Sequence, residues 1–591
     1  MSKTLVLHLF FIGLLLQSCT DQTEPLTQTD TIRLNQIGFY PYAPKIAIVA
    51  VETIGDFYLS PVGSEEKIFS GKLTGPQTSN LSGKQTMIAD FSDFQQVGKF
   101  VLNVPGIGQS YPFEIKTKVH EGVATAALKS FYFQRMSTGL SEKYAGKWHR
   151  PLAHSDDQVM VHASAATKER PEGTIISSPG GWYDAGDYNK YVVNSSIAVG
   201  TLMSLYEDFP DYFQKLESDI PESGNGVPDL LDETRWNLLW MLTMQDPNDG
   251  GVYHKCTTAE FEGMVKPEEA TAQRYVVQKS TAAALGFAAS MAQTARVFGA
   301  FENEFPGFAE KCLEAAKAAW QWANENPNVI YDQQKMNEQF EPKVVTGDYG
   351  GNDLKDEKIW AATELYVTTR DDAYLQSVEF YPSENLTIQN WGDVRTMAYF
   401  TLLRYADKLS PTSLGILADL KKRYVAFADG LVEKTNQQAY LAPMENDVKN
   451  YVWGSTSVCA NQGISLIYAY RLTGDKKYLN YALADLDYLL GRNATGYSFV
   501  TGFGNKTPLH IHHRPSESDG IDDPIPGLIA GGPNPGQQDR CPGYPNDLPD
   551  ESYTDDVCSY ASNEIAINWN APLVYLAFAI DILKSEPPLK G

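Results

Sequence analysis

The sequence predicts a mainly α-helical protein that begins with a small β-sandwich. From Thr31 to about Lys116, short β-rich runs alternate with turns made of Gly, Pro and Ser, a pattern typical of a sandwich domain. After about His120, long Ala- and Leu-rich segments with helical spacing replace this pattern, and no comparable series of strands returns. About ten helices joined by loops, several of them long, indicate paired helices arranged in a ring, with function on the loops at one end.

Each predicted element follows from its local pattern. The clearest strands, at residues 46–51, 57–59 and 100–104, consist mainly of apolar, β-branched or aromatic residues. The helices are recognised by apolar residues that recur every three to four positions. The predicted helical segments are 197–206, 230–244, 281–298, 313–323, 358–366, 397–406, 416–427, 465–472, 478–490 and 565–580.

The first 30 residues indicate export rather than a folded element. Lys3 is followed by an apolar run over residues 5–16 that is too short to span a membrane stably, so residues 1–18 are predicted to be a cleaved signal peptide. The signal ends in Leu-Gln-Ser before Cys19, which resembles a bacterial lipobox, where the cysteine is lipidated and becomes the mature N-terminus. A plain secretory signal with a chance cysteine is the alternative.

Residues 19–30 are polar and include a proline, and they predict a tether. The β-sandwich is expected over residues 31–117 and the helical domain over residues 118–588. The protein is therefore expected to be exported and lipid-anchored to the bacterial envelope, at the periplasmic or surface face of the outer membrane.

Charge and composition exclude some partners. The chain of 591 residues has 73 acidic and 48 basic residues and a formal charge of −25, which repels nucleic acid and anionic lipid surfaces. We expect no nucleic-acid partner, and membrane contact only through the lipid anchor. Six cysteines are too few for disulfides to carry so large a fold. Cys541 and Cys558 are the only pair close in sequence, and a bridge or two free thiols both remain open.

Two acids on a glycine-rich turn are the strongest chemical signal. Asp184 and Asp187 lie three residues apart within the aromatic-flanked segment 180–191, just before a predicted helix. That spacing lets both carboxylates point at one spot, where they can hold a water and act as a general base. The alternative makes Asp184 a turn former and Asp187 a helix N-cap.

A third acid stands near the C-terminus. Glu564 lies at a loop-to-helix junction among aromatic residues, a semi-apolar place that can raise the pKa of a carboxyl. A protonated acid beside an ionised aspartate is the division of labour that glycoside hydrolysis needs. As an isolated residue, Glu564 could instead be a first-turn acid favoured by the helix dipole.

These segments, with residues 497–504 and 508–515, resemble the signatures of glycoside hydrolase family 9. Residues 32–39 and 89–92 resemble the immunoglobulin-like domain that precedes the catalytic domain in one branch of that family. The resemblance covers nearly the whole mature chain. It implies an (α/α)6 barrel behind an immunoglobulin-like β-sandwich, and an inverting cellulase-type hydrolase.

The resemblance also implies roles for individual residues. Asp187 would be the general base, Asp184 would help to hold the attacking water, and Glu564 would be the general acid, so that all three must meet across one cleft. His512 and Arg514 match the family's substrate-binding His-x-Arg. A surface cluster of His510, His512 and His513 is the alternative, and no cysteine or acid stands at ligand spacing to make them a metal site.

Aromatic residues in Gly- or Asn-containing segments are candidates for stacking against sugar rings. They are Trp391, Trp453, Tyr497 and Trp569. Core packing is the alternative for each of them.

The chemistry requires no cofactor, and the sequence departs from the family at a metal site. Relatives with the immunoglobulin-like domain often hold a structural zinc with two Cys and two His. Here residues 152–154 replace the expected Cys-His pair, Tyr183 replaces a histidine, and no cysteine lies between Cys19 and Cys256. We expect no structural zinc.

Calcium is left open. Two loops offer the oxygen ligands that calcium takes, although such loops are more often turns and helix caps. The candidate ligands are Asp229, Asp232, Glu233, Asp348 and Asp353.

The sequence thus predicts an endo-β-1,4-glucanase that acts with inversion on cellulose-like, mixed-linkage or xyloglucan chains. Its partner would be a β-glucan polysaccharide or oligosaccharide. An exo-acting cellobiohydrolase or β-glucosidase-type enzyme of the same family is the first alternative, and chitosan-derived substrates remain open. A surface glycan-binding lipoprotein without turnover and a purely structural helical scaffold are the alternatives from other classes.

Overall fold

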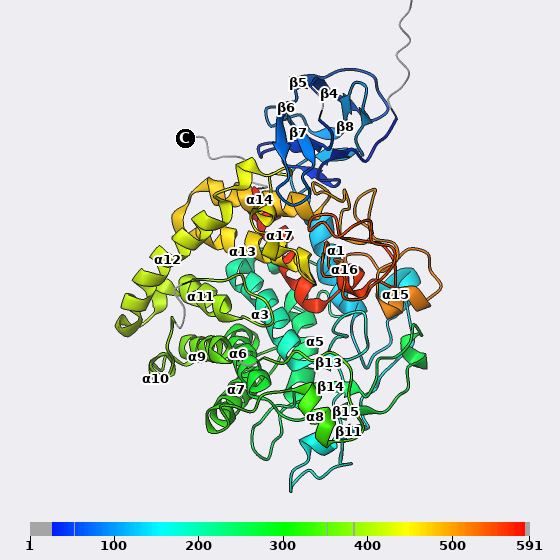
Figure 1. The fold of residues 1–591 in the computed structure, drawn as a ribbon. Helices are drawn as coiled ribbons and strands as arrows, with labels where there is room; N and C mark the ends of the chain where they lie inside the picture. The colour runs from blue at the N-terminus through cyan, green and yellow to red at the C-terminus, as the bar shows by residue number, and fades with distance from the viewer. Residues whose placement is uncertain (1–26, 53, 352, 382–384, 585–591) are drawn as a thin grey trace, which may run out of the picture.

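The computed structural model describes residues 27–584 except 53, 352 and 382–384 (Figure 1). The predicted signal peptide, Cys19 and residues 20–26 of the predicted tether lie outside the described residues, as do residues 585–588 of the predicted helical domain. In the described ranges, no helix combines the length and apolar character needed to cross a membrane.

A small β-rich domain, blue in Figure 1, lies at one end of a larger helical domain. One sheet has the order β1-β3-β7-β6, and the other has the order β2-β10-β8-β4-β5 with β9 paired to β8. Nearly all pairings are antiparallel, β2 with β10 being parallel. The strands are β1 (Ile32–Arg33), β2 (Gly38–Phe39), β3 (Ile46–Val49), β4 (Asp56–Pro61), β5 (Phe69–Lys72), β6 (Thr74–Thr78), β7 (Gln85–Asp90), β8 (Gly98–Val104), β9 (Gly108–Gln109) and β10 (Phe113–Ile115).

The alternation of side chains along β3 explains how this domain packs. Ala47 and Val49 point into the core between the sheets, while Ile48 is buried against Ala439 and Tyr440 of the helical domain. Because successive residues of a strand face opposite sides, one short strand serves both contacts.

Residues 27–29 belong to the β-rich domain, although they lie inside the segment predicted as a tether. The Thr29 amide donates to the Gln109 carbonyl, and the Gln109 amide donates to the Thr27 carbonyl, both at 2.9 Å. These backbone hydrogen bonds attach residues 27–29 to β9.

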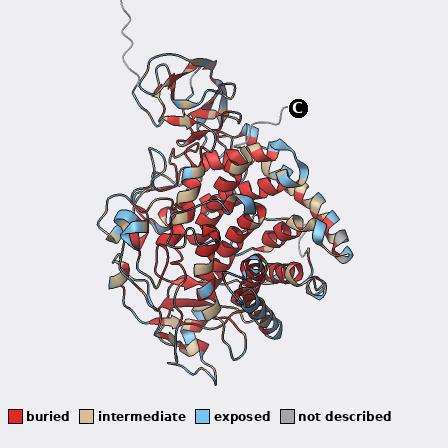
Figure 2. Cartoon of the chain, turned by 180° about the vertical axis from the view of Figure 1, so that it is seen from behind, coloured by how far each residue is buried: buried red, intermediate tan, exposed pale blue. Residues whose placement is uncertain are grey.

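Mostly buried helices form the centre of the larger domain (Figure 2). In chain order, each follows a helix that is partly exposed. The central helices are α3 (Val192–Asp208), α6 (Thr281–Phe298), α9 (Lys355–Thr369), α11 (Arg395–Arg404), α13 (Ser455–Thr473) and α17 (Ile567–Lys584). The partly exposed helices are α1 (Glu121–Phe133), α5 (Asp229–Thr243), α7 (Phe308–Glu325), α10 (Ala373–Gln376), α12 (Leu414–Val432) and α14 (Lys476–Leu489). Short helices lie in the connections: α2 (Glu142–Ala145), α4 (Pro210–Phe213), α8 (Gln333–Gln339), α15 (Arg514–Ser518) and α16 (Tyr560–Asn563).

A third sheet lies among the loops of the helical domain, where the sequence predicted no further strands. Its order is β12-β11-β15-β14-β13. The sequence pattern missed it because its strands are only two to four residues long and most of their residues are buried, so they show little alternation of apolar and polar positions. The strands are β11 (Val159–Val161), β12 (Ile175–Ile176), β13 (Lys190–Tyr191), β14 (Lys255–Thr258) and β15 (Arg274–Val276).

Buried hydrogen bonds join the two domains. The Tyr40 hydroxyl donates to Asp581 Oδ1 of α17 at 2.8 Å and lies 2.9 Å from His120 Nδ1. Asn35 donates to Asp487 Oδ1 at 2.8 Å. These groups are buried, so loss of one partner leaves another polar group unsatisfied.

We expect Tyr40→Phe to destabilise the protein by about 1–3 kcal/mol, because Asp581 and His120 would each lose a buried partner. The matched control is Tyr42→Phe, since the Tyr42 side chain is 59% exposed, and its effect should stay within about 0.5 kcal/mol. Thermal unfolding of the two variants makes the comparison, and equal midpoints would contradict the proposed importance of the interface.

Candidate active site

The turn that carries Asp184 and Asp187 is shaped by two glycines before it. Gly180 and Gly181 have φ of +78° and +81°, a left-handed conformation that other residues rarely adopt. The chain then passes through the acids into β13, and α3 begins only at Val192. Asp187 is therefore not the N-cap of this helix, so the interpretation of Asp187 as a helix cap is wrong.

Three segments that are distant in sequence meet at Gly186. The Arg514 amide donates to the Gly186 carbonyl at 3.1 Å, and the Ile567 amide donates to the Asp184 carbonyl at 2.8 Å. The Gly186 amide donates to Glu564 Oε1 at 3.3 Å, across 378 residues of sequence. A Cβ atom at position 186 would lie only 2.0 Å from the His512 carbonyl oxygen, so only glycine permits this approach.

Asp184 is buried and held by two donors. The Tyr349 hydroxyl donates to its Oδ2 at 2.6 Å, and the side-chain Nδ2 of Asn194 donates to its Oδ1 at 2.7 Å. Burial, followed by the nearby charge of Asp187, raises the pKa of Asp184 to about 8. The Asp184 carboxyl thus retains its proton near neutral pH.

The two carboxylate oxygens of Asp187 have different surroundings. Its Oδ2 accepts hydrogen bonds from Asn189 at 2.7 Å and from the Tyr191 hydroxyl at 2.9 Å. Its Oδ1 is buried and has no hydrogen-bond partner among the described residues. A buried carboxylate oxygen without a donor needs a water or a ligand hydroxyl.

Glu564 lies between α16 and α17, and its backbone pairs with His512. Burial, then the charge of Asp187, raises the pKa of Glu564 well above its ordinary value. Glu564 therefore holds a proton that it can donate, beside two aspartates on the facing turn.

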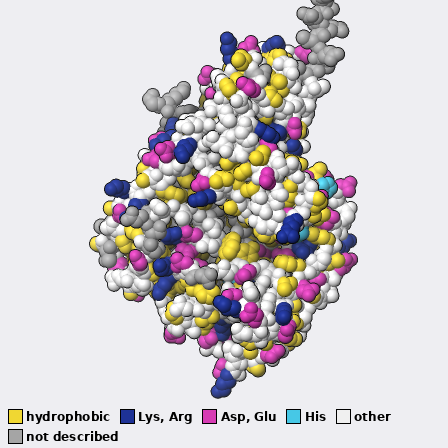
Figure 3. Space-filling model, viewed as in Figure 1, with side chains coloured by type: hydrophobic (Ala, Val, Ile, Leu, Met, Phe, Trp, Pro, Cys, Tyr) yellow, Lys and Arg dark blue, Asp and Glu magenta, His cyan; other side chains and the backbone are white. Residues whose placement is uncertain are grey.

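The three acids line a single cavity of about 580 Å³. Trp391, Trp453 and Trp569 line it too, as expected for sugar-stacking candidates. On the face of the molecule that Figures 1 and 3 show, Figure 3 has a hollow near the middle, with hydrophobic and acidic side chains along it. The cavity combines ring surfaces with carboxyl groups, which suits a neutral polar ligand with apolar faces, such as a saccharide.

Among the described residues that line the cavity, Tyr497 does not appear. Its ring packs edge-on against Tyr553 with centroids 5.0 Å apart, and the Lys506 ammonium lies 4.7 Å from its centre. Its glycine-containing segment suggested a sugar contact, but the side chain packs within the protein instead.

His512 and Arg514 lie close to the acids, although among the described residues they are not part of the cavity lining. His512 Nδ1 lies 2.6 Å from the Val557 carbonyl, and burial lowers the pKa of His512. Arg514 donates to the carbonyls of Gly186 at 2.7 Å and Glu262 at 2.8 Å.

The three histidines do not form a surface cluster. His513 is buried and its Nε2 lies 2.9 Å from Gln134 Oε1, whereas His510 is exposed. Neighbouring positions in this segment therefore have separate surroundings.

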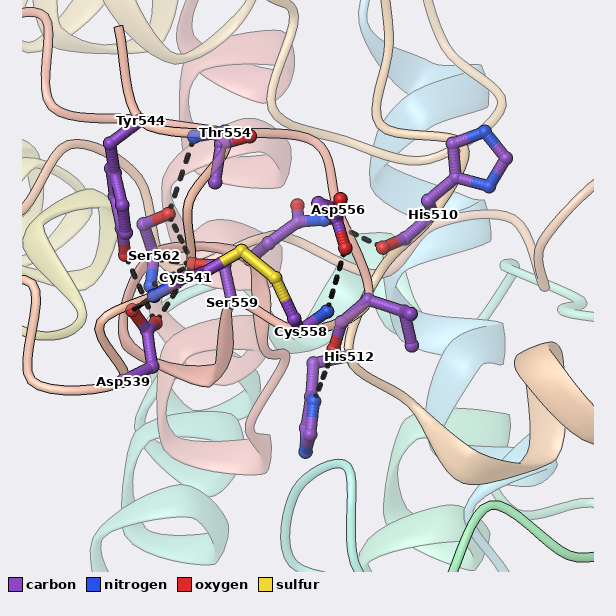
Figure 4. The surroundings of a disulfide bond; sticks show 12 residues. His510, His512, Asp539, Cys541, Tyr544, Thr554, Asp556, Cys558, Ser559 and Ser562 are labelled. Carbon is purple, nitrogen blue, oxygen red and sulfur yellow. Dashed lines mark hydrogen bonds between the residues drawn. A yellow bond between two sulfur atoms is a disulfide. The ribbon is translucent and has the colours of Figure 1, made fainter. Parts of the chain in front are cut away.

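A disulfide joins Cys541 to Cys558 (Figure 4), so the two cysteines are not free thiols. It links the loop that carries Gln538, a cavity residue, to the loop whose Val557 carbonyl contacts His512. The disulfide therefore braces one wall of the site. Cys256, Cys312 and Cys459 are buried and unpaired with one another.

The calcium candidates of α5 are held by protein donors. Asp229 accepts from Ser218 and Ser223, Asp232 accepts from Asn225, and Glu233 accepts from Arg135 and Trp182.

In the second loop, Asp348 and Asp353 accept from backbone amides two residues ahead, as turn and cap residues do. Where the sequence departs from the zinc-binding pattern, His154 Nδ1 lies 2.8 Å from the Tyr183 hydroxyl. Across the described residues, the one His, Cys, Asp and Glu group with metal-like spacing contains Cys541, Asp556 and Cys558, and its cysteines are disulfide-bonded. The metal expectations stay predictions.

Several residues of the site were missed by sequence reasoning. Tyr191 and Asn189 lie in the acid motif itself, and their polar side chains could have been considered as partners of Asp187. Tyr349 lies in the loop considered for calcium, and only the fold brings it to Asp184. Phe261 and Asn568 also line the cavity, without any local motif that signals it.

Comparisons with known proteins show the family of this chain. A model described as glycosyl hydrolase family 9 matches residues 120–577, and a model of the cellulase N-terminal ig-like domain matches residues 27–109. The chain belongs to glycosyl hydrolase family 9 and is a glycoside hydrolase with an immunoglobulin-like domain before a helical catalytic domain.

The chain is 48% identical to the xyloglucan-specific endo-β-1,4-glucanase BoGH9A of Bacteroides ovatus, over 96% of each protein. It is 33% identical to endoglucanase D of Acetivibrio thermocellus, over 94% of this chain and 84% of the relative. A solved structure of a Bacteroides ovatus family 9 protein superposes with a TM-score of 0.90 at 46% identity, covering 94% of this chain and all of that one.

The raised pKa of Asp184 predicts a pH-dependent stability effect. A carboxyl with a pKa of about 8 when folded and 3.8 when unfolded contributes stability below pH 3.8 that is lost as the pH rises through 8. Asp184→Asn removes this loss, so the variant should become more stable relative to wild type from pH 4 to pH 8, by at most about 1.4 kcal/mol per pH unit.

Thermal unfolding across that pH range measures the difference between the two proteins. Asp157→Asn, a change at an exposed carboxylate, is the control and should follow wild type. A difference between Asp184→Asn and wild type that stays constant or shrinks with rising pH would contradict the assigned proton.

Proposed function

We propose that this protein is an inverting endo-β-1,4-glucanase. The observation that carries the proposal is the meeting of Asp184, Asp187 and Glu564 in one aromatic-lined cavity. A non-catalytic glycan-binding protein would not need three carboxyl groups there, since burying them costs stability.

We assign the roles as follows. Asp187 accepts a proton from water as the water attacks the anomeric carbon, and its Oδ1, which has no hydrogen-bond partner in the part of the chain that the structure describes, supports this role. Glu564 donates its proton to the departing glycosidic oxygen as the carbon–oxygen bond breaks, and its raised pKa supports this role. Asp184, protonated and fixed by Tyr349 and Asn194, holds the water by a hydrogen bond.

His512 and Arg514 support the site from behind the cavity wall in this proposal. Arg514 fixes the acid turn, the turn that carries Asp184 and Asp187, through the Gly186 carbonyl. His512 joins that turn to the disulfide-braced loop through the Val557 carbonyl.

The substrate we propose is xyloglucan or another β-1,4-glucan chain. The specificity printed in the name of BoGH9A, and its 48% identity over nearly the full length of both proteins, support xyloglucan. Exo action is the second candidate, because a protein described as cellulose 1,4-beta-cellobiosidase is 32% identical over 96% of this chain.

We further propose that the helical domain is an (α/α)6 barrel. The alternation of partly exposed and buried helices supports it, as do the contacts that run from α13 through α17, α3, α6 and α9 to α11. The proposed domain limits are residues 31–117 and 118–588, with the attachment of residues 27–29 noted above. Lipid attachment at Cys19, after a signal peptide, would place the enzyme on the bacterial envelope.

We expect Asp187→Asn and Glu564→Gln each to lower reducing-sugar release from xyloglucan by about 10²–10⁴-fold, because each removes a proton-transfer group. Asp157→Asn and Glu517→Gln, at exposed carboxylates, are the matched controls and should retain activity. Wild-type activity in both site variants would refute the roles.

Polymer viscosity, measured together with reducing-sugar release, separates endo action from the alternatives. Endo action lowers the viscosity of the polymer well before most reducing ends appear, whereas exo action does not. Binding of xyloglucan without any release of reducing sugar would support the glycan-binding alternative.

A further inference from the structure

Phe261 is an exposed aromatic side chain at the edge of the acid-lined cavity. It lines that cavity together with Asp187 and Glu564, yet 47% of its surface remains accessible. It lies in the loop that follows β14. A single exposed ring on a loop usually needs no explanation. This loop, however, is attached to the turn that carries the acids, and that attachment needs one.

Arg514 ties the loop to the turn that carries the acids. Its Nε donates to the Glu262 carbonyl at 2.8 Å, and its Nη1 donates to the Gly186 carbonyl at 2.7 Å. The guanidinium carbon also lies 5.7 Å from the centre of the Phe261 ring. One buried, planar side chain therefore contacts the ring, its loop and the acid turn at once.

Both ends of the loop are attached to the same turn. At the start, Asn189 Oδ1 accepts from the Thr258 amide at 2.9 Å, while the Asn189 amide group donates to Asp187 Oδ2 at 2.7 Å. At the end, the Tyr188 hydroxyl donates to the Val265 carbonyl at 2.7 Å. Residues 259–265 are thus fixed relative to Asp187 from three sides.

We propose that Phe261 is a substrate-binding residue that stacks against a sugar ring of the bound glucan, and that Arg514 is its positioning residue. This inference rests on the proposed endoglucanase function. A ring held exposed beside the acids presents an apolar face to the sugar without further ordering of the loop. The attachment through Arg514 and Asn189 keeps a fixed separation between this subsite and Asp187, which would align the chain for cleavage.

The test compares Phe261→Ala with wild type on xyloglucan and on cello-oligosaccharides of increasing length. We expect KM to rise about threefold to tenfold on substrates long enough to reach the ring, with the thermal midpoint unchanged. Phe261→Trp, which keeps an aromatic face, should restore most of the affinity. Met264→Ala is the matched control, because Met264 is 38% exposed in the same loop but is not among the described residues lining the cavity.

Arg514→Lys tests the positioning role, since lysine keeps the charge but loses the planar pair of donors. We expect it to raise KM when Phe261 is present and to raise it much less in the Phe261→Ala background. An equal rise in KM caused by Arg514→Lys in both backgrounds would contradict positioning of the ring.

Two outcomes overturn the proposals separately. If wild type hydrolyses the substrates and Phe261→Ala matches Met264→Ala at every chain length, the Phe261 subsite is refuted and the proposed function stands. If wild type hydrolyses none of them, the proposed function fails. Calorimetry then decides whether Phe261 contacts the glucan, by comparing the affinity for xyloglucan of the Asp187→Asn protein with and without Phe261→Ala.

Discussion

The close backbone approach at Gly186 is the constraint on which the site depends. The Gly186 carbonyl accepts from the Arg514 amide and side chain, its amide donates to Glu564, and its missing Cβ makes room for the His512 carbonyl. The acid turn and the C-terminal acid are thus joined by direct contacts rather than by intervening side chains. These contacts hold the acid turn and the segment of Glu564 together, so the fold itself brings the carboxyl groups to one place.

The surrounding structure offsets the destabilising effect of burying these acids. Asp184 and Glu564 are held at raised pKa values in a largely dehydrated place, which lowers stability but prepares both groups for proton chemistry. The buried helices, the anchored β-rich domain and the Cys541–Cys558 disulfide supply rigidity around the site. A rigid frame with a strained electrostatic centre is the expected compromise in an enzyme.

The parts of the site that could be predicted from the sequence were those that lie in short, continuous motifs. Asp184 and Asp187 share one short motif, Glu564 lies at a recognisable loop-to-helix junction, and the comparisons confirm the family. The β-rich start and the helical remainder followed equally from local periodicity. The strands β11–β15 did not, since they are short and mostly buried and hence lack a readable pattern.

Long-range partners could not be predicted in the same way. Tyr349 reaches Asp184 across 165 positions, and Phe261 lines the cavity from a loop that Arg514 and Asn189 contact. Tyr497 lies in a similarly suggestive segment, but its ring packs on Tyr553 and its sugar contact stays a prediction. Local sequence indicates which residues can perform chemistry, whereas tertiary contacts decide which of them do.

The configuration of the first product tests the central claim most directly. If Asp187 activates water on one face of the sugar while Glu564 protonates the leaving oxygen on the other, cleavage of a β-linked oligosaccharide must first release the α-anomer. Proton NMR spectra recorded during the first minutes of hydrolysis, before mutarotation, distinguish the two anomers. We predict that the α-anomer accumulates first; initial accumulation of the β-anomer would contradict the account.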